Sequence, residues 1–290
     1  MVQARLEARC PAHEFIIKTI KAKADRDPEA PMVAFSGEGI FVKELETALL
    51  DGGIDLAVHS LKDLPVDTTR GIRIAAVTER EDPRDALVSR DGKRLDGLPA
   101  GARIGTSSLR RKSQVLLQRR DVQVADIRGN VDTRLRKLDE GQYDAIIVAA
   151  AGLIRLGLDA RITQRLDPDE MLPEPGQGAL AVETRDGDHA MRDVAAVVDD
   201  PATRACVEAE RAFLQALGGG CRVPIAALAE ARHETLTLTG AVIAADGSRC
   251  LRGSATGSLL EPVALGKSLA GKLIAQGAQE ILATRTPEAT

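Results

Sequence analysis

Hydrophobic residues along the chain form the short runs and helical spacings that are typical of a folded α/β protein. The stretch 41–50 carries an apolar face with helical spacing and ends at Gly52, so it predicts an amphipathic helix. The apolar run 54–59 follows, and its lack of alternation predicts a buried parallel strand. Two further strands are predicted at 15–20 and 72–77.

The middle of the chain repeats a strand-then-helix order three times. Strands are predicted at 102–106, 122–127 and 145–150, and they are followed by helices at 107–119, 131–140 and 152–156. Such alternation predicts a parallel sheet with helices on both faces. The apolar stretch 180–184 is predicted to return the chain to the first sheet, so that two lobes are joined by two crossings.

The last ninety residues change character and predict a small α+β domain. Asp200 and Pro201 are expected to begin a helix that extends to Leu217. Two strands, 235–244 and 249–257, flank an Asp-Gly turn, and 261–282 is helical. A chain of 290 residues exceeds one ordinary domain. We therefore expect an α/β protein with domains at 1–78 together with 179–198, at 84–173, and at 201–290.

Composition narrows the classes of function. The chain is 44% hydrophobic and 28% charged, which is typical of a globular protein, and its net charge of -4 does not favour nucleic acid as a partner. The longest apolar run, 145–154, is too short to span a bilayer. The four cysteines are widely spaced, which predicts no zinc site or other metal site and favours reduced thiols in the cytoplasm.

Arginines recur directly after the predicted strands of the second sheet. Arg110 and Arg111 follow the first, Arg128 and Arg134 the second, and Arg155 the third. The carboxyl ends of parallel strands share one edge, where ligands of open α/β sheets bind. A solvated surface position explains any one of these arginines, but their recurrence favours a ligand with several carboxylates or phosphates. The phosphate-binding glycine motifs of nucleotide sites are absent from the sequence.

Two other residues are candidates for chemistry. Asp63 lies in a loop after a predicted buried strand, where a carboxylate can stabilise a cation or move a proton, although an ordinary capping role fits equally well. Cys221 follows three glycines and precedes Arg222, which favours the nucleophilic thiolate, although a buried structural thiol fits equally well. Cys206 shares a helix face with apolar residues and is predicted to be a core residue.

Together these segments resemble the porphobilinogen deaminase (hydroxymethylbilane synthase) family over nearly the whole chain. The matching stretches occur in family order and are Phe41–Glu46, Asp55–Pro65, Glu79–Asp85, Gly105–Arg111, Ile127–Arg134, Pro175–Leu180 and the glycine-rich loop of Cys221. Each stretch alone is weak evidence for the family, but the occurrence of all of them in the same order is specific to it.

The resemblance implies two domains folded like periplasmic binding proteins and a small third domain. It implies a dipyrromethane cofactor joined by a thioether to Cys221, on which four porphobilinogen units are condensed head to tail with release of ammonia. Asp63 would be catalytic. The cofactor and substrate carboxylates would be held by Lys62, Ser108, Arg110, Arg111, Arg128, Arg134 and Arg155. The expected protein is a cytoplasmic monomer whose partner is the small molecule porphobilinogen, with no nucleic acid and no membrane.

Three departures from the family pattern lead to an alternative. The family's opening strand, with its Arg and Ser, is expected to precede the first residue of this chain. Glu38 and Ala34 stand where the family carries lysines, and Glu38 should repel a carboxylate. The alternative is a catalytically impaired relative, or an anion- or polypyrrole-binding protein of the same fold. Cys221 favours the enzyme, because a carrier needs no tethering thiol.

Overall fold

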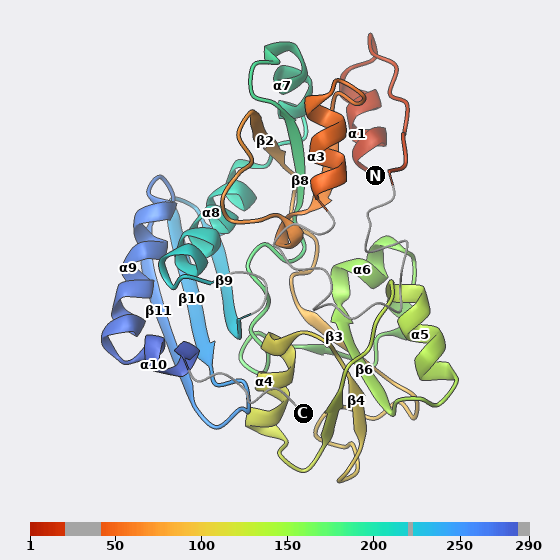
Figure 1. Ribbon diagram of the computed structural model, residues 1–290, viewed down its shortest axis with the longest axis vertical. Helices are drawn as coiled ribbons and strands as arrows, with labels where there is room; N and C mark the ends of the chain where they lie inside the picture. The colour runs from red at the N-terminus through yellow and green to blue at the C-terminus, as the bar shows by residue number, and fades with distance from the viewer. Residues whose placement is uncertain (21–41, 220–222, 284–290) are drawn as a thin grey trace. The chain divides into compact units, whose positions relative to one another are not determined.

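A computed structural model describes residues 1–20, 42–219 and 223–283 (Figure 1). The chain divides into two compact units. The first unit comprises Met1–Glu81 and Ala179–Ala205, and the second comprises Asp82–Gly178 and Cys206–Thr290. The second unit therefore contains most of both stretches that the sequence predicts as separate domains, 84–173 and 201–290.

The first unit is built on a three-stranded sheet in the order β1-β8-β2 (Figure 1). Its strands are β1 (Ala57–Ser60), β8 (Leu180–Arg185) and β2 (Ile72–Val77). The central position of β8 confirms that the chain returns to the first sheet. The strand predicted after residue 54 is found as β1, and its pairing within the described residues is with β8 in the antiparallel direction rather than the predicted parallel one. The apolar run does not distinguish direction, because apolar side chains suit a strand that runs either way.

The described residues that accompany this sheet form the helices α1 (Val2–Arg9), α3 (Lys43–Leu50) and α7 (His189–Ala196). Val2 and Leu6 of α1 pack in one core with Ala76 and Val182 of the sheet. The predicted strand at 15–20 is wrong, since this stretch has no regular structure and Ile16 is 82% exposed. No strand among the described residues pairs with it, and an apolar run without a partner strand gains nothing from extension.

The second unit contains a five-stranded sheet in the order β5-β4-β6-β3-β7. Its strands are β3 (Asp85–Ser89), β4 (Arg103–Gly105), β5 (Gln123–Ala125), β6 (Ala145–Ala149) and β7 (Gln164–Leu166). Strands β4, β5 and β6 are parallel, as predicted. Strand β3 is antiparallel to both β6 and β7, so the sheet is mixed.

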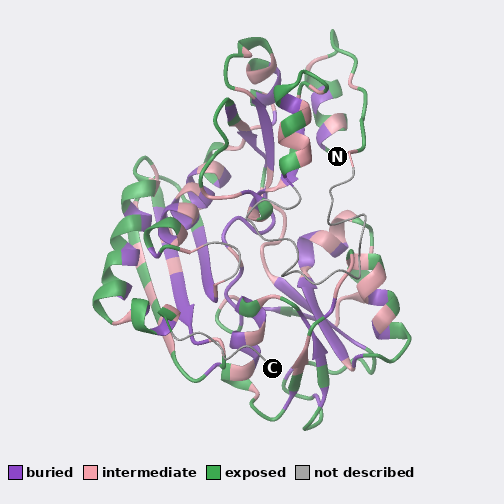
Figure 2. Cartoon of the chain, in the orientation of Figure 1, coloured by how far each residue is buried: buried purple, intermediate pink, exposed green. Residues whose placement is uncertain are grey.

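The helices α4 (Leu109–Gln118), α5 (Val131–Asp139) and α6 (Ala150–Arg155) each follow one of the three parallel strands. Both faces of the sheet are buried, as the purple strands β3, β4 and β6 in Figure 2 show. One core contains Leu87 and Ile147, and a second core contains Val88 and Ile146. Helices on both faces of a largely parallel sheet confirm the α/β class.

The end of the chain forms a second, smaller sheet. Helix α8 (Pro201–Ala216) begins as predicted, since Oδ1 of Asp200 accepts a hydrogen bond of 2.7 Å from the backbone N–H of Thr203. The strands β9 (Ile225–Arg232), β10 (Thr235–Ile243) and β11 (Cys250–Ser258) are antiparallel, in the order β11-β10-β9. The predicted hairpin is therefore confirmed, and β9 is an addition that the sequence pattern did not reveal.

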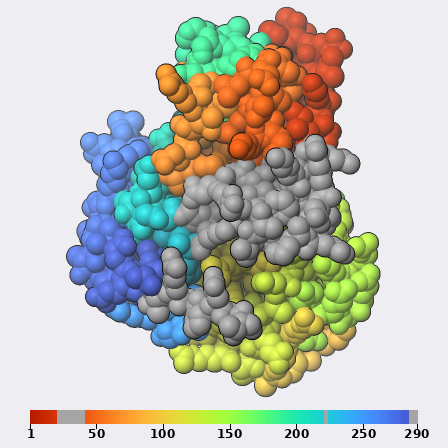
Figure 3. All heavy atoms as spheres, in the orientation of Figure 1, coloured from red at the N-terminus to blue at the C-terminus, as the bar shows by residue number. Residues whose placement is uncertain are grey.

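Two helices complete this part, α9 (Pro262–Ala275) and α10 (Ala278–Ala283). The sequence predicts one continuous helix, but Gly277 with φ of 95° interrupts it. Cys206 packs with Phe213 and Leu269 in the core of this part, as predicted. The opposite side of α9 carries Lys267 and is open to solvent. Helix α9 belongs to the blue part of the chain in Figure 3. Within the described residues, no helix combines the length and apolar character needed to cross a membrane.

Candidate functional site

The five predicted arginines all follow carboxyl ends of parallel strands of the second unit. Arg110 and Arg111 lie in the first turn of α4 after β4, and Arg128 lies in the turn after β5. Arg134 belongs to α5, and Arg155 ends α6, which begins directly after β6. Since β4, β5 and β6 are parallel neighbours, the three turns lie at the same edge of the sheet.

Helix α4 begins at this edge with a local cap. Ser108 is the N-cap residue, and its side chain accepts a hydrogen bond from the backbone N–H of Arg111 at 3.4 Å. The cap orients the first turn so that Arg110 and Arg111 are buried, with exposed fractions of 3% and 5%. Two buried guanidinium groups need anionic partners, because an unpaired buried charge is costly.

Asp85 is that partner, and the sequence patterns did not single it out. It begins β3 and lies opposite Ala149 at the end of β6, because β3 runs against the parallel strands. Its Oδ2 accepts from Nη1 of Arg110 at 2.7 Å, and its Oδ1 accepts from Nη2 and Nε of Arg111 at 2.8 and 3.0 Å. Burial would raise the pKa of Asp85, but the charges of Arg110 and Arg111 and hydrogen bonds hold it well below its usual range.

The two arginines use their nitrogens differently. Arg111 places its Nε and Nη2 on Asp85 and donates from Nη1 to the carbonyl oxygen of Ile147 at 3.2 Å. Arg110 donates from Nη1 alone, to Asp85 and to the carbonyl oxygen of Leu172 at 2.8 Å. Its Nε and Nη2 are buried and have no hydrogen-bond partner in the part of the chain that the structure describes. These two atoms form one edge of the guanidinium plane, which can donate two parallel hydrogen bonds to one carboxylate.

The loop of Gln177 closes this cluster. Nε2 of Gln177 donates to Oδ1 of Asp85 at 2.9 Å and to the carbonyl oxygen of Pro83 at 2.8 Å. Glu210 of α8, which is fully buried, accepts hydrogen bonds of 2.7 Å from the backbone N–H groups of Gly176 and Ala229. Glu210 thereby fixes this loop to β9. The only sequence signal for these residues is that Asp85 and Gln177 belong to stretches that resemble the family.

The remaining arginines of this edge are half-buried. Nε of Arg134 donates to the carbonyl oxygen of Gly129 at 2.8 Å, which holds its stem against the turn that carries Arg128. Nη2 of Arg155 donates to the carbonyl oxygen of Gly178 at 2.7 Å. The edge of the sheet and the Gln177 loop are therefore joined by two arginine contacts, one from Arg111 and one from Arg155.

Lys62 and Asp63 lie in the first unit, in a short 3₁₀ turn (Leu61–Asp63) directly after β1. The turn is fixed by its backbone, since the N–H of Leu61 donates to the carbonyl oxygen of Ala179 at 3.0 Å. Leu61 is buried, Lys62 is half-buried and Asp63 is exposed. The turn therefore presents Asp63 on the surface of the first unit, while Lys62 is partly covered.

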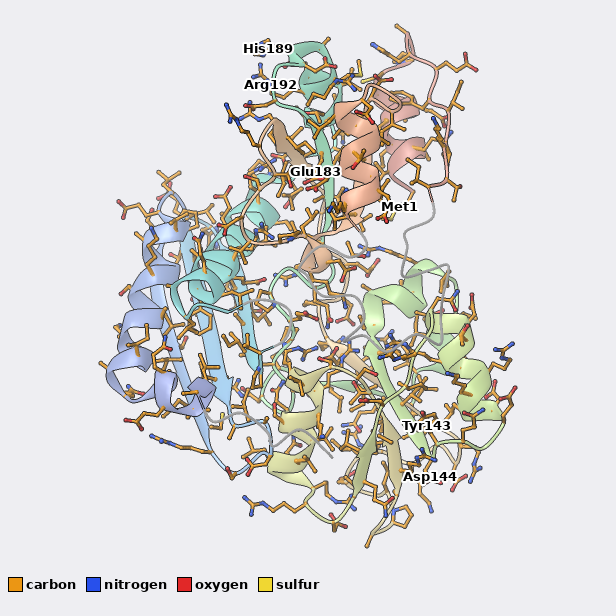
Figure 4. All side chains as sticks on the ribbon, in the orientation of Figure 1. Met1, Tyr143, Asp144, Glu183, His189 and Arg192 are labelled. Carbon is orange, nitrogen blue, oxygen red and sulfur yellow. The ribbon has the colours of Figure 1, made fainter. Side chains whose placement is uncertain are left out.

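Next to this turn, the first unit holds a buried pair of titratable side chains. His59 of β1 and Glu183 of β8 approach to 3.0 Å between Nε2 and Oε2, and Glu183 is labelled in Figure 4. Both are nearly fully buried, so the contact lies in the interior of the sheet, on the strand that leads into Lys62 and Asp63. Sequence reasoning placed His59 in a predicted strand without assigning it a role.

The predicted cysteine site and two of the departures lie outside the described residues. These positions are Cys221, Glu38 and Ala34. Of the other cysteines, Cys206 is buried in a hydrophobic core. Burial raises the pKa of the Cys250 thiol, and the nearby charge of Arg252 opposes this shift. Neither has the exposed, electropositive surroundings that make a thiolate at neutral pH.

Known proteins and family models match almost the entire chain. Residues 1–193 match the family model of the porphobilinogen deaminase, dipyromethane cofactor binding domain, and residues 204–275 match that of the porphobilinogen deaminase C-terminal domain. Porphobilinogen deaminase of Methylobacillus flagellatus is 49% identical over 97% of this chain and 91% of its own length. The corresponding proteins of Roseiflexus castenholzii and Thermus thermophilus are each 48% identical, over 93% and 92% of their lengths.

The chain therefore belongs to the porphobilinogen deaminase family, which confirms the resemblance found in the sequence. It is accordingly a transferase of tetrapyrrole biosynthesis, and its first matched region is the part that binds the dipyrromethane cofactor. Among solved structures, a BvgS VFT2 domain of Bordetella pertussis aligns over 68% of this chain and 76% of its own, with 17% identity and a TM-score of 0.40.

Proposed function

We propose that this chain is a hydroxymethylbilane synthase, which condenses four porphobilinogen units head to tail on a dipyrromethane group and releases ammonia. One observation carries the proposal beyond family membership. Parallel strands bring five arginines to one edge of a sheet, and two of them share a single buried carboxylate. This edge carries excess positive charge and suits a ligand with several carboxylates.

The residues present fit the dipyrromethane group. Each pyrrole ring of that group bears two carboxylates, and the Nε–Nη2 edge of Arg110 is buried without a partner among the described residues. A buried donor left unpaired costs about 1–3 kcal/mol, so a carboxylate that accepts from this edge would recover that energy. Arg128, Arg134 and Arg155 would bind further carboxylates along the same edge. Ser108 already caps α4, and its part is to orient the first turn.

Two residues of the first unit are proposed to act on the pyrrole rings. When bound, the dipyrromethane would supply the free pyrrole position to which the first unit is joined, and each later unit would be joined to the end of the growing chain. Asp63 would stabilise positive charge on pyrrole nitrogens and would accept and return protons there. Lys62 would hold a carboxylate, with its stem half-buried in the 3₁₀ turn. Cys221 would carry the group through a thioether, since its sequence neighbour Arg222 and the preceding glycines favour a reactive thiolate.

Intact mass and turnover test the proposal together. Protein purified from cells should be heavier than its sequence by one dipyrromethane, and it should consume porphobilinogen with release of ammonia. Cys221→Ser should lose the added mass and the activity, whereas Cys206→Ser, in the hydrophobic core, should keep the added mass. An adduct that survives in Cys221→Ser would refute the attachment site. Protein that carries the adduct but consumes no porphobilinogen would be a polypyrrole-binding relative instead.

The proposal extends to a monomer that works in the cytoplasm. Cys10 and Cys250 are free thiols, which fits a reducing compartment. Sedimentation of the purified protein should give the mass of one chain over a wide range of concentration. A concentration-dependent dimer would contradict the monomer, and a signal confined to the periplasm after cell fractionation would contradict the compartment.

A further inference from the structure

The carboxylate of Asp85 is buried against the guanidinium groups of Arg110 and Arg111, which belong to the edge proposed to bind carboxylates. This position indicates a role in ligand binding as well as in stability. We propose that Asp85 is a positioning residue, which fixes the guanidinium of Arg110 so that its Nε–Nη2 edge is presented to a carboxylate of the bound ligand. The inference rests on the proposed function of the arginine edge. It assigns separate roles to Arg110 and Arg111, two adjacent arginines that the sequence pattern does not distinguish.

The division of tasks follows from the hydrogen bonds. Arg111 gives the edge of its guanidinium that suits a carboxylate to Oδ1 of Asp85, through Nε and Nη2. That edge is therefore occupied by a group of the protein. Arg110 approaches the other carboxylate oxygen end-on through Nη1, and the corresponding edge of Arg110 remains without a partner among the described residues. Arg111 is thus the counter-ion of Asp85, and Arg110 is the residue that binds the carboxylate of the ligand.

The surroundings of Asp85 allow it little freedom. It is fully buried, and Gln177 donates to the same oxygen that Arg111 uses, at 2.9 Å. The carbonyl oxygen of Leu172 accepts from Arg110 and also from Nε2 of Gln114, at 2.8 and 3.0 Å. Arg110 is therefore held from two sides, by a strand on one side and by the Leu172 segment on the other. A guanidinium fixed in this way loses little further freedom when a ligand binds.

Electrostatics support the same assignment. Two guanidinium groups share one carboxylate, so the cluster retains excess positive charge in a buried environment. Without Asp85 the two guanidinium groups would repel each other and turn apart. With Asp85 they stay together, and the remaining charge is available to one carboxylate of the ligand.

The test compares Asp85→Asn with the matched control Asp144→Asn. Asp144 also pairs with an arginine, Arg90 at 3.5 Å, but lies at the amino end of β6, the opposite edge of the same sheet (Figure 4). In Asp85→Asn we expect the fraction of purified protein that carries the dipyrromethane mass to fall, and the KM for porphobilinogen of the loaded fraction to rise about tenfold or more. Asp144→Asn should keep the mass and the KM of the unmodified chain.

A second variant keeps the inference testable if Asp85→Asn fails to fold. Arg110→Lys retains the positive charge beside Asp85 but lacks the Nε–Nη2 edge. It should fold, and it should bind the dipyrromethane poorly by intact mass. Full cofactor mass with an unchanged KM in Arg110→Lys, or in a folded Asp85→Asn, would overturn the inference and leave the proposed function intact. Absence of the added mass from the unmodified chain would instead refute the proposed function.

Discussion

The ring nitrogen Nε2 of His59 lies 3.0 Å from Oε2 of Glu183, and both side chains are less than 5% exposed. The two residues belong to neighbouring antiparallel strands, with Glu183 opposite Ala57 on β1 and His59 opposite Ala181 on β8. Neither atom has a well-aligned hydrogen bond within the described residues, so the two side chains form a close polar contact in the interior of the first unit. Because Lys62 and Asp63 follow β1 directly, the pair anchors the strand that carries them.

Removing one member of this pair should destabilise the first unit. His59→Leu leaves the Glu183 carboxylate buried without its partner, and breaking a buried pair in this way costs roughly 3–5 kcal/mol. The double variant, with both His59→Leu and Glu183→Leu, should lose less free energy of unfolding than the sum of the losses in the two single variants. Urea unfolding of the three variants measures the coupling. Strictly additive losses would mean that the two side chains do not stabilise each other.

Asp63→Asn should reduce turnover by about 10²–10³, because the amide keeps the size of the side chain but cannot neutralise a developing positive charge. The dipyrromethane mass should remain, since the attachment is proposed at Cys221. Asp67→Asn, a nearby exposed position in the same loop, is the control and should turn over porphobilinogen normally. Single-turnover measurements separate this effect from product release. Equal rates for Asp63→Asn and the unmodified chain would make Asp63 a purely structural residue.

Arg128→Leu should weaken the binding of porphobilinogen about tenfold to hundredfold, which corresponds to the loss of about 1.5–3 kcal/mol from a charged hydrogen bond. Arg128 is a cleaner test than Arg110, whose removal also disturbs the buried Asp85 cluster. Arg136→Leu is the matched control, because the side chain of Arg136 is 68% exposed and its ion pair with Glu140 is distant, at 3.8 Å. The KM of each variant gives the comparison. Similar values for both variants would contradict a binding role for Arg128.

The stability that Asp85 provides should depend on pH in the acid range. Arg110 and Arg111 hold the pKa of Asp85 below its usual range against the effect of burial. Its contribution is then fully present above the unfolded pKa of about 3.9 and declines as the pH falls toward the folded pKa. The difference in unfolding free energy between the unmodified chain and Asp85→Asn should be constant from about pH 6 to 8 and shrink below about pH 4. A difference undiminished at about pH 3 would argue against the charge as its source.

The sequence by itself determined the features that depend on neighbours along the chain. The caps at Ser108 and Asp200, the hairpin around Gly247, and the order of strands and helices in the second unit are all found near their predicted places. A cap or a tight turn is made by residues a few positions apart, so the local sequence contains the necessary information. The positions of the arginines after three strands follow from the same local order.

Only the tertiary structure decided which strands lie side by side and in which direction. Strand pairing joins residues far apart in the sequence, and an apolar run looks the same in a parallel and in an antiparallel strand. The antiparallel direction of β3 brings Asp85 to the edge that carries Arg110 and Arg111, so no local pattern could single it out. Likewise, the stretch 15–20 has the composition of a strand, but it has no partner strand among the described residues and stays irregular.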